Sequence, residues 1–474
     1  MTLVYIIIGL IILYLIFKPS KKTRTYSSGY VKPLPKYTPS YKTRIKSYDV
    51  SNIEINDDFK LALNSIENDG RSIYITGKAG TGKSTLLKYF RATTKKNIVV
   101  LAPTGLAAIN VDGQTIHSFF KFPPRLIEQN KIKHLRDKEV VRKLDVMVID
   151  EVSMVRADLM DGIDLSLKLN RNNNLPFGGV QMVLIGDLFQ LPPIVKEKEL
   201  KQYFEEHYQS PYFFSAKVFD KVNFQMMELN KIYRQTEADF INILNQIREK
   251  KINHNLLASL NQKVISNNNY DKNSYVTLTP TNAVANEINQ GYLERLNCQE
   301  FTYYAHKEGV FDTSSFPTEE ELKLKNGAQV ILIKNDKDKR WVNGTICKIE
   351  RLSSNQVFVN IDGFTCEVKR ETWENIEYYF NKEKNKIEER IIGVFEQFPL
   401  RLAWALTIHK SQGQTFSKVI VDMGNGAFAH GQTYVALSRC KSLDGLVLKR
   451  PLEYKDIILD DTVYRAQEIF QKLN

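Results

Sequence analysis

A glycine-rich segment that ends in lysine and serine is the part of this sequence best equipped for chemistry. It consists of Gly77, Lys78, Ala79, Gly80, Thr81, Gly82, Lys83 and Ser84, followed by Thr85. Glycines in such a loop let backbone N–H groups turn toward a polyphosphate, and the N-terminus of a following helix attracts the same anion. An apolar run at 72–76 and a helical pattern at 85–90 supply the strand and helix that this motif requires. The segment predicts a nucleoside triphosphate site in which Lys83 contacts the β- and γ-phosphates and Ser84 binds Mg²⁺.

A pair of acids follows a second apolar run. Residues 146–149 have the pattern of a strand that is buried on both faces, and Asp150 and Glu151 come directly after it. Asp150 can hold Mg²⁺ through its water shell, and Glu151 can act as the general base toward the attacking water. Acids at such a place also cap helices, but beside a phosphate-binding loop they favour hydrolysis of the nucleotide.

Two more apolar runs, at 97–101 and 181–185, predict further strands of the same sheet. The segments that follow them contain Thr104 and Gln190. Ligands of open α/β sheets bind at the carboxyl ends of the strands, so both side chains are expected near the ligand. The pattern predicts the α/β class.

Length and composition are those of an ordinary globular protein. A chain of 474 residues predicts two or three domains. The four cysteines (Cys298, Cys347, Cys366 and Cys440) are widely separated. This usage suits a reducing compartment and argues against both a zinc site and a disulfide framework.

The N-terminus differs from the rest of the chain. Residues 3–17 are apolar apart from Gly9, and basic residues follow immediately. We expect residues 1–17 to form a single-pass transmembrane anchor, with the bulk of the chain on the cytosolic side by the positive-inside rule. A buried element of the main fold and a cleaved targeting peptide are the alternatives.

A basic segment follows the apolar one. Residues 18–48 contain nine lysines and arginines, no acid and several prolines. We expect 18–51 to be a disordered linker that is attracted to anionic lipid headgroups or to nucleic acid. Subtracting these nine charges from the net charge of +12 leaves +3 for the remaining chain. Overall basicity is therefore no argument for nucleic-acid binding by the folded part.

The order of the motifs resembles superfamily 1 DNA helicases, in particular the Pif (petite integration frequency) branch, which is related to RecD. The resemblance covers about residues 50–450. In the first half it rests on segments 77–85, 102–108, 113–119, 150–154, 176–181 and 186–193. In the second half it rests on segments 229–235, 278–282, 341–345, 406–416 and 431–439.

The resemblance implies two RecA-like domains with ATP and Mg²⁺ between them. Arg234 and Arg439 match two arginines that reach the γ-phosphate, and Gln190 and Gln412 match glutamines that couple the state of the γ-phosphate to domain closure. The implied catalytic residues are Lys83, Glu151, Gln190, Arg234 and Arg439. The implied ATP site is Gly77 to Thr85 together with Gln412 and Gly413, and Ser84 and Asp150 are the implied metal ligands.

The same resemblance implies a surface for single-stranded DNA. The matching positions are Thr104, His117, Thr281, Asn343, His409 and Lys410. Packing or helix capping is an open alternative for each of them. The implied function is an ATP-dependent DNA helicase in replication, repair or recombination, which moves 5′-to-3′ on single strands and unwinds forked DNA, as a monomer. An RNA or RNA–DNA hybrid helicase, and a membrane-tethered nucleic-acid clamp with weak ATPase activity, are the alternatives.

One position departs from the family pattern. Relatives carry a glutamine upstream of the phosphate loop that reads the edge of adenine, whereas Phe59 stands at that position here. A phenylalanine can stack on a base but cannot form the paired hydrogen bonds that distinguish adenine. We therefore expect a relaxed nucleotide preference.

The motif order also predicts the domain limits. A first RecA-like domain is expected at 52–225, with a small insertion at 121–143. A second is expected at 226–334 and 394–474. Short β-branched runs between them predict a small inserted β-barrel at 335–393. The charged stretch 382–390 is expected to be a solvated loop or helix.

Overall fold

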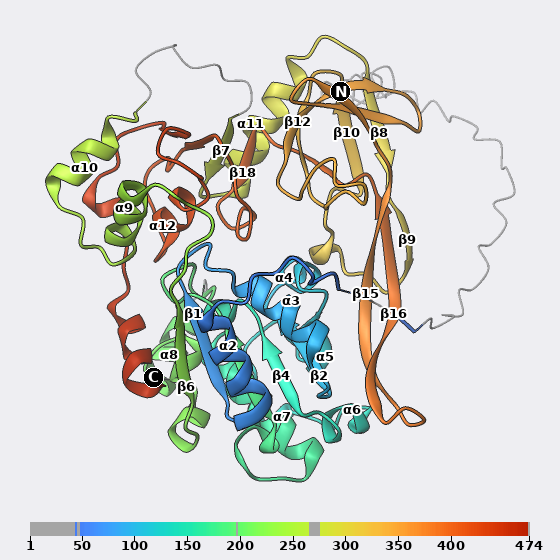
Figure 1. Ribbon diagram of the computed structural model, residues 1–474, viewed down its shortest axis with the longest axis vertical. Coiled ribbons are helices and arrows are strands. Elements are labelled where there is room, and N and C mark those ends of the chain that lie inside the picture. The colour runs from blue at the N-terminus through green and yellow to red at the C-terminus, as the bar shows by residue number, and fades with distance from the viewer. Residues whose placement is uncertain (1–42, 45–47, 196–197, 265–274, 473–474) are drawn as a thin grey trace, which may run out of the picture. The chain divides into compact units, whose positions relative to one another are not determined.

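The structure is a computed structural model that describes residues 43–44, 48–195, 198–264 and 275–472. All of these residues belong to one compact unit. They form two parallel sheets and several sets of antiparallel strands (Figure 1).

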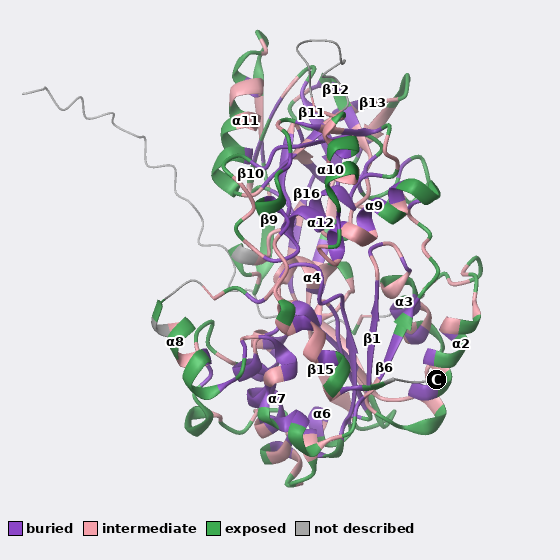
Figure 2. Cartoon of the chain, turned by 90° about the vertical axis from the view of Figure 1, so that its left-hand side faces the viewer, coloured by how far each residue is buried: buried purple, intermediate pink, exposed green. Residues whose placement is uncertain are grey.

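A seven-stranded parallel sheet carries the glycine-rich loop. Its strand order is β21-β6-β1-β5-β4-β2-β3, and every pairing in it is parallel. The central strands are buried on both faces, as their continuous apolar runs predict (Figure 2). The strands are β1 (Ile73–Gly77), β2 (Ile98–Ala102), β3 (Gln114–Thr115), β4 (Val146–Ile149), β5 (Gln181–Ile185), β6 (Gln225–Leu229) and β21 (Gln471–Lys472).

Alternate side chains of these strands face two separate apolar layers. Ile73 and Ile75 pack with α2 and α3, while Tyr74 packs on the other face with α7 and the segments around it. The helices of this part are α2 (Asp57–Asn64), α3 (Lys83–Thr93), α4 (Gly105–Asn110), α5 (Ile116–Phe120), α6 (Lys138–Arg142), α7 (Ala157–Arg171) and α8 (Lys198–His207). Short π- or 3₁₀-turns occur at Ser65–Asp69, Gln129–Lys131, Val152–Met154, Pro176–Gly179, Phe213–Ser215 and Lys217–Lys221.

A smaller parallel sheet has the order β18-β7-β19-β20. Its strands are β7 (Val276–Thr279), β18 (Ala405–Thr407), β19 (Val419–Val421) and β20 (Leu446–Leu448). The helices of this part are α9 (Ala238–Arg248), α10 (His254–Asn261), α11 (Asn282–Glu294) and α12 (Gln432–Leu437). Apolar residues of α9 and α12 share one core with these strands.

The antiparallel strands form three sets, which extend beyond the expected 335–393 module. They have the orders β14-β13-β12-β11-β17, β10-β8 and β15-β16-β9. The strands are β8 (Glu300–Tyr304), β9 (His306–Gly309), β10 (Glu321–Lys325), β11 (Gln329–Leu332), β12 (Ile346–Leu352), β13 (Val357–Ile361), β14 (Phe364–Val368), β15 (Glu371–Asn381), β16 (Lys386–Gln397) and β17 (Leu400–Leu402). A further 3₁₀ turn lies at Thr313–Ser315.

The long hairpin β15–β16 differs from the sequence expectation for 382–390. Instead of a solvated loop or helix, these residues form the turn and the first part of β16. The hairpin contacts the first sheet, because the Tyr378 hydroxyl and the backbone of Val100 lie within hydrogen-bonding distance. Asn97 accepts a hydrogen bond from the backbone of Ile387 (3.0 Å).

The last described segment returns to the first sheet. After β20 the chain forms turns at Tyr454–Asp456 and Asp461–Arg465, then α13 (Ala466–Ile469) and β21. The buried ring of Phe470 contacts Phe213 and Phe224, which lie in the core of the first part. From Asp461 on, this segment therefore packs with the first parallel sheet, whereas Ile457 before it packs in the core of the second.

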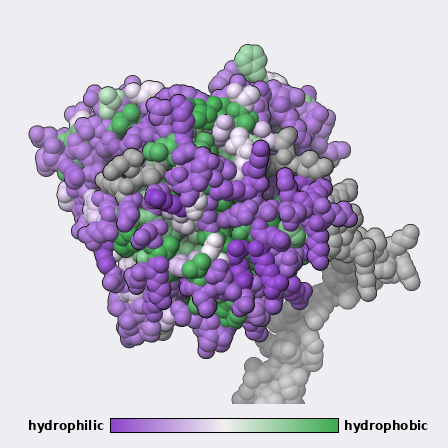
Figure 3. Space-filling model, turned by 60° about the horizontal axis from the view of Figure 1, so that its bottom comes forward, coloured by the Kyte–Doolittle hydropathy of each residue, from purple (hydrophilic) through white to green (hydrophobic). Residues whose placement is uncertain are grey.

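The expectation of a single-pass membrane protein is corrected here. No helix among the residues that the structure describes is long and apolar enough to cross a membrane. The segment 1–17 itself lies outside the described residues, as does most of the expected linker 18–51. The face shown in Figure 3 is mostly hydrophilic, with apolar groups dispersed over it.

One described part of the expected linker is held against the fold. The backbone of Arg44 donates a hydrogen bond to Glu389 of β16, and its guanidinium contacts Glu389 (3.0 Å), Glu374 (2.7 Å) and Asp112 (3.2 Å). Residue 44 is therefore part of an ion-pair cluster and not of a disordered segment.

Candidate nucleotide and nucleic-acid sites

The glycine-rich loop connects β1 to α3. Gly80 and Gly82 have φ angles of +85° and +86°, which side chains other than glycine rarely adopt. A Cβ at Gly80 would clash with Arg234, and one at Gly82 would crowd the ring of Phe59. The loop therefore approaches both residues closely, and the N-terminus of α3 starts from it.

Lys83, the first residue of α3, folds back over this loop. Its ammonium donates hydrogen bonds to the carbonyls of Gly77 (2.6 Å) and Lys78 (3.1 Å). Burial lowers the pKa of Lys83, while the negative charges of Asp187 and Glu151 act in the opposite direction. The lysine is thus held beside the acidic groups of neighbouring strands.

The acids Asp150 and Glu151 lie at the carboxyl end of β4. Burial, together with the charge of Glu151, raises the pKa of Asp150 to about 7, and burial also raises the pKa of Glu151. Two adjacent carboxylates, of which Asp150 is buried, are stabilised in their charged form by a cation. The Ser84 hydroxyl and Asp150 carboxylate line one cavity and offer the hard oxygen ligands that Mg²⁺ prefers, so the donor set fits that ion.

Two arginines from different segments meet near the loop. Arg234 follows β6, and Arg439 follows α12 and is 1% exposed. Both contact Ser438: Arg234 donates to its carbonyl (3.3 Å) and Arg439 to its hydroxyl (3.0 Å). Among the described residues, neither forms an ion pair with a carboxylate within 4 Å, although the charge of Glu151 acts on both.

Gln190 connects this region to the second part. Its buried amide donates to the carboxylate of Asp187 (3.2 Å), which also pairs with Arg248 of α9 (3.1 Å). Burial alone would raise the pKa of Asp187, but the charges of Arg248 and Lys83 hold it below its ordinary value. The neighbouring carbonyl of Leu188 accepts a hydrogen bond from His430 (2.7 Å).

A cavity of about 730 Å³ gathers many of the expected residues. Its lining includes Ala79, Gly80, Thr81, Gly82, Lys83, Ser84, Thr85, Glu151, Gln190, Arg234, Gly413 and Arg439. Gly77, Lys78, Asp150 and Gln412 do not line it. Asp150 and Gln412 instead line an adjoining cavity of about 290 Å³, which shares Ser84, Glu151 and Gly413 with the first.

Three of the six expected DNA residues line that smaller cavity, namely Thr104, Asn343 and Lys410. Thr104 also caps α4 by accepting a hydrogen bond from Ala107 (3.2 Å), and burial lowers the pKa of Lys410. Thr281, which caps α11, lies outside this cavity, and so do His117 and His409. The structure thus brings half of the expected set together.

Several residues at these cavities have no counterpart in the sequence expectations. Tyr233, Thr415 and Lys441 line the larger cavity; Trp373 and Arg401 line the smaller one. The first three lie in or beside recognised motifs, and this proximity in sequence could have predicted their place at the site. Trp373 and Arg401 come from the antiparallel strands β15 and β17, where the sequence offers no motif.

Comparison with known proteins identifies the family. The sequence profile described as PIF1-like helicase matches residues 53–256. The chain is 30% identical over 438 residues to the ATP-dependent DNA helicase Pif1 of Bdellovibrio bacteriovorus, covering 90% of this chain and 94% of that relative. It is 32% identical to the ATP-dependent DNA helicase PIF1 of Emericella nidulans, where it covers 82% of this chain but only 60% of that longer protein.

Solved structures agree with this assignment. Pif1 of Bacteroides sp in complex with ADP-AlF4 is 37% identical, with a TM-score of 0.81, and the match covers 89% of this chain and all of that one. Bacteroides Pif1 bound to ssDNA is 36% identical over the same shares, with a TM-score of 0.64. The fold, the motif order and these similarities show that the chain belongs to the PIF1-like helicase family.

Proposed function

We propose that this ATP-dependent DNA helicase moves 5′-to-3′ along single-stranded DNA and unwinds forked duplexes, with the 730 Å³ cavity as its ATP site. The observation that carries the proposal is the pair Arg234 and Arg439. These two cations lack a carboxylate partner among the described residues and line the same cavity as the phosphate loop and Glu151. A triphosphate is the anion that this arrangement suits.

The residues around the cavity support distinct roles in hydrolysis. The loop and Lys83 hold the β- and γ-phosphates, and Ser84 and Asp150 hold Mg²⁺, which neutralises phosphate charge when bound. Glu151 accepts a proton from the water that attacks the γ-phosphorus. The bond from the γ-phosphorus to the bridging oxygen breaks, and ADP and phosphate leave. Arg234 and Arg439 stabilise the charge that develops in between.

Two glutamines fit a coupling role. Gln190 contacts Asp187, which Arg248 of α9 also holds, so a change at the γ-phosphate can reach the second parallel sheet. The side-chain nitrogen of Gln412 is buried without a hydrogen-bond partner among the described residues. A phosphate oxygen or a DNA phosphate supplies the acceptor that it lacks.

The smaller cavity is the proposed start of the DNA path. Thr104 and Lys410 come from segments at the carboxyl ends of β2 and β18, one in each parallel sheet, and Asn343 joins them. A DNA strand that contacts residues of both sheets would be moved when ATP binding brings the sheets together. His117, Thr281 and His409 are proposed to contact DNA beyond this cavity.

The test is strand separation by the full chain on forked, 5′-tailed and 3′-tailed DNA and on RNA duplexes, with Glu151→Gln as the control. Unwinding only of forked and 5′-tailed DNA, lost in the control, is the expected result. Unwinding of 3′-tailed DNA would overturn the polarity, and preference for RNA would reassign the substrate. DNA-stimulated hydrolysis without strand separation would instead indicate a nucleic-acid clamp.

A further inference from the structure

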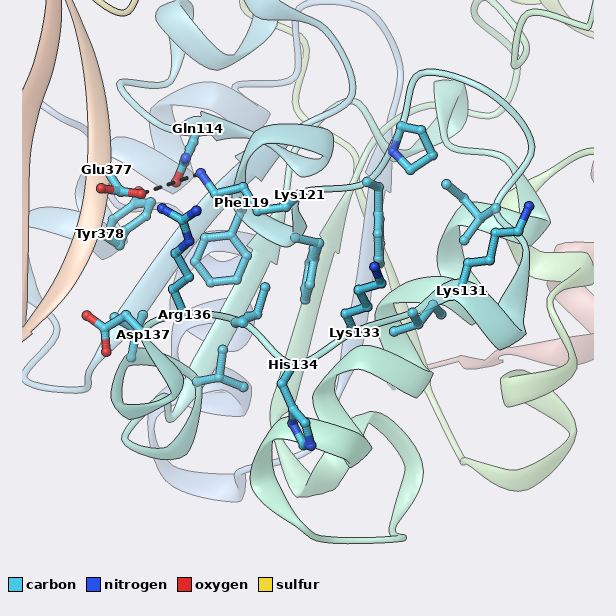
Figure 4. A pocket seen from close by; sticks show the side chains of 18 of the residues that line it. Gln114, Phe119, Lys121, Lys131, Lys133, His134, Arg136, Asp137, Glu377 and Tyr378 are labelled. Carbon is cyan, nitrogen blue, oxygen red and sulfur yellow. Dashed lines mark hydrogen bonds and ion pairs between the residues drawn. The ribbon is translucent and has the colours of Figure 1, made fainter.

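A cavity of about 710 Å³ lies apart from the nucleotide site (Figure 4). Its walls come from α5, from the following segment up to α6, and from the hairpin β15–β16. It shares no lining residue with the 730 Å³ cavity. Nothing in the proposed ATP cycle makes use of it.

The inner wall of this cavity is aromatic. Phe119 and Phe120 are buried and meet edge to face with their ring centres 4.9 Å apart. Phe120 in turn stacks on Phe122 at 5.2 Å, and Tyr378 lies beside Phe119 (Figure 4). A planar, apolar ligand matches such a wall because it can pack against the part of the rings that remains exposed.

An unsatisfied polar atom lies at the same wall. Gln114 is 2% exposed and lines the cavity, and its carbonyl oxygen has no hydrogen-bond partner among the described residues. Its amide nitrogen is already used, since it donates to Ser118 (3.0 Å). The free oxygen can therefore accept a hydrogen bond from a ligand.

The rim of the cavity is basic. Lys121 and Lys131 are paired with Glu377 and Glu128. Arg125, Lys133 and Arg136 are exposed and form no ion pair with any carboxylate of the described chain; they are the cations that remain available. Asp137 lines the same cavity and has no ion pair among the described residues, so three cations face one acid. The positive balance matches a phosphate chain that carries planar rings.

We propose that this cavity binds one unpaired nucleotide of DNA. Its base lies against Phe119 and Phe120 and donates a hydrogen bond to Gln114, while neighbouring phosphates lie at Arg125, Lys133 and Arg136. The exocyclic amino group of adenine, cytosine or guanine provides the donor. This inference rests on the proposed function, because it needs DNA to reach α5, which also carries His117.

The experiment is a binding scan of the full chain with forked DNA in which a single abasic residue is moved through the single-stranded arms. Loss of a stacked base is expected to weaken binding about tenfold at one position and little elsewhere. In Gln114→Leu that position is expected to lose its sensitivity. Arg136 is exposed, so Arg136→Ala is expected to fold normally and to lower the slope of log binding constant against log salt concentration by about one. Lys95 is exposed but lies outside the cavity, and Lys95→Ala is expected to leave that slope unchanged.

The outcomes separate this inference from the proposed function. A uniform abasic scan, or an unchanged scan in both variants, overturns the inference even if DNA-stimulated ATP hydrolysis is normal. Absence of that stimulation in the unmodified chain overturns the proposed function, while the binding scan still decides the cavity. Free dAMP or polyglutamate that occupies the cavity while no DNA position responds reassigns it to a free nucleotide or to an acidic peptide.

Discussion

Arg234 lies close enough to Arg439 for its charge to act on it: burial, reinforced by the charge of Arg234, lowers the pKa of Arg439 to about 9. Like charges are brought together in a protein at a cost, which an anionic ligand removes. The pair thus has an unfavourable interaction that a bound anion, such as the γ-phosphate in the proposed ATP site, would relieve.

Replacement of Arg234 tests this relationship. We expect Arg234→Gln to lower kcat for ATP hydrolysis about a thousandfold, because an arginine at the γ-phosphate contributes on that scale. The melting temperature of the variant without nucleotide should not fall, because the substitution removes the repulsion between Arg234 and Arg439. Steady-state hydrolysis and thermal shifts with and without ATP measure both. Hydrolysis within a few-fold of the unmodified chain would rule out the assigned role.

The dependence on Mg²⁺ should change with pH. The pKa of Asp150 is raised from 3.8 to about 7 in the folded chain, so the folded state holds an extra proton between these values. Its contribution to the free energy of unfolding therefore falls as the pH rises from about 4 to 7. In the proposed role of Asp150 as a metal ligand, Mg²⁺ has to displace that proton below pH 7. We expect the half-saturating Mg²⁺ concentration for hydrolysis to be about tenfold higher at pH 6 than at pH 8.

The control for this prediction is the ATP concentration, which must saturate at both pH values so that only the metal is titrated. Equal half-saturating concentrations at pH 6 and pH 8 would contradict it. Asp150→Asn should weaken Mg²⁺ binding and remove most of the pH dependence, because the group that titrates is gone.

Nucleotide selectivity should be relaxed. Phe59 is 2% exposed, lines the 730 Å³ cavity and lies against the glycine loop at Gly82, so it offers a ring but no hydrogen bond to a base. We expect hydrolysis of GTP, CTP and UTP with kcat/KM within about tenfold of ATP, since a paired hydrogen bond is what would discriminate more. Phe59→Gln is expected to restore a preference for ATP. Strong selectivity for ATP in the unmodified chain would refute the prediction.

The Arg44 cluster should fasten the hairpin β15–β16 to the first part. The Arg44 side chain is 13% exposed and contacts three carboxylates, of which Glu374 and Glu389 belong to the hairpin and Asp112 follows α4. We expect Arg44→Ala to lower the free energy of unfolding by about 1–3 kcal/mol and to speed proteolysis of the hairpin turn. Lys60→Ala, which breaks an exposed pair with Asp57, is the matched control and should change stability little.

Motifs with short, fixed spacing were readable from the sequence. The phosphate loop and the pair after β4 are local, because the backbone shape and the chemistry come from consecutive residues. The meeting of Arg234 and Arg439 followed only from the family resemblance, since residues 205 positions apart share no local pattern.

Elements fixed by tertiary packing were not readable. The charges at 382–390 indicate a solvated segment, yet a two-stranded ribbon exposes enough surface to carry them. The composition of the whole basic segment predicted disorder, and such an average cannot show that one residue within it, Arg44, forms ion pairs with the fold. The two-residue strand β21 is too short to show a periodic pattern in the sequence. It pairs with β6 because the neighbouring ring of Phe470 packs in the core of the first part.

The return of that last segment has a consequence for synthesis. Tyr74, Phe213 and Phe470 lie in one aromatic cluster, although the whole second parallel sheet separates Phe470 from the other two along the chain. During synthesis on the ribosome, part of the apolar core of the first sheet stays exposed until residues 461–472 have been made and can cover it. The chain also crosses between the two sheets twice, after β6 and again after β20. Two covalent connections therefore limit how the sheets can move relative to each other.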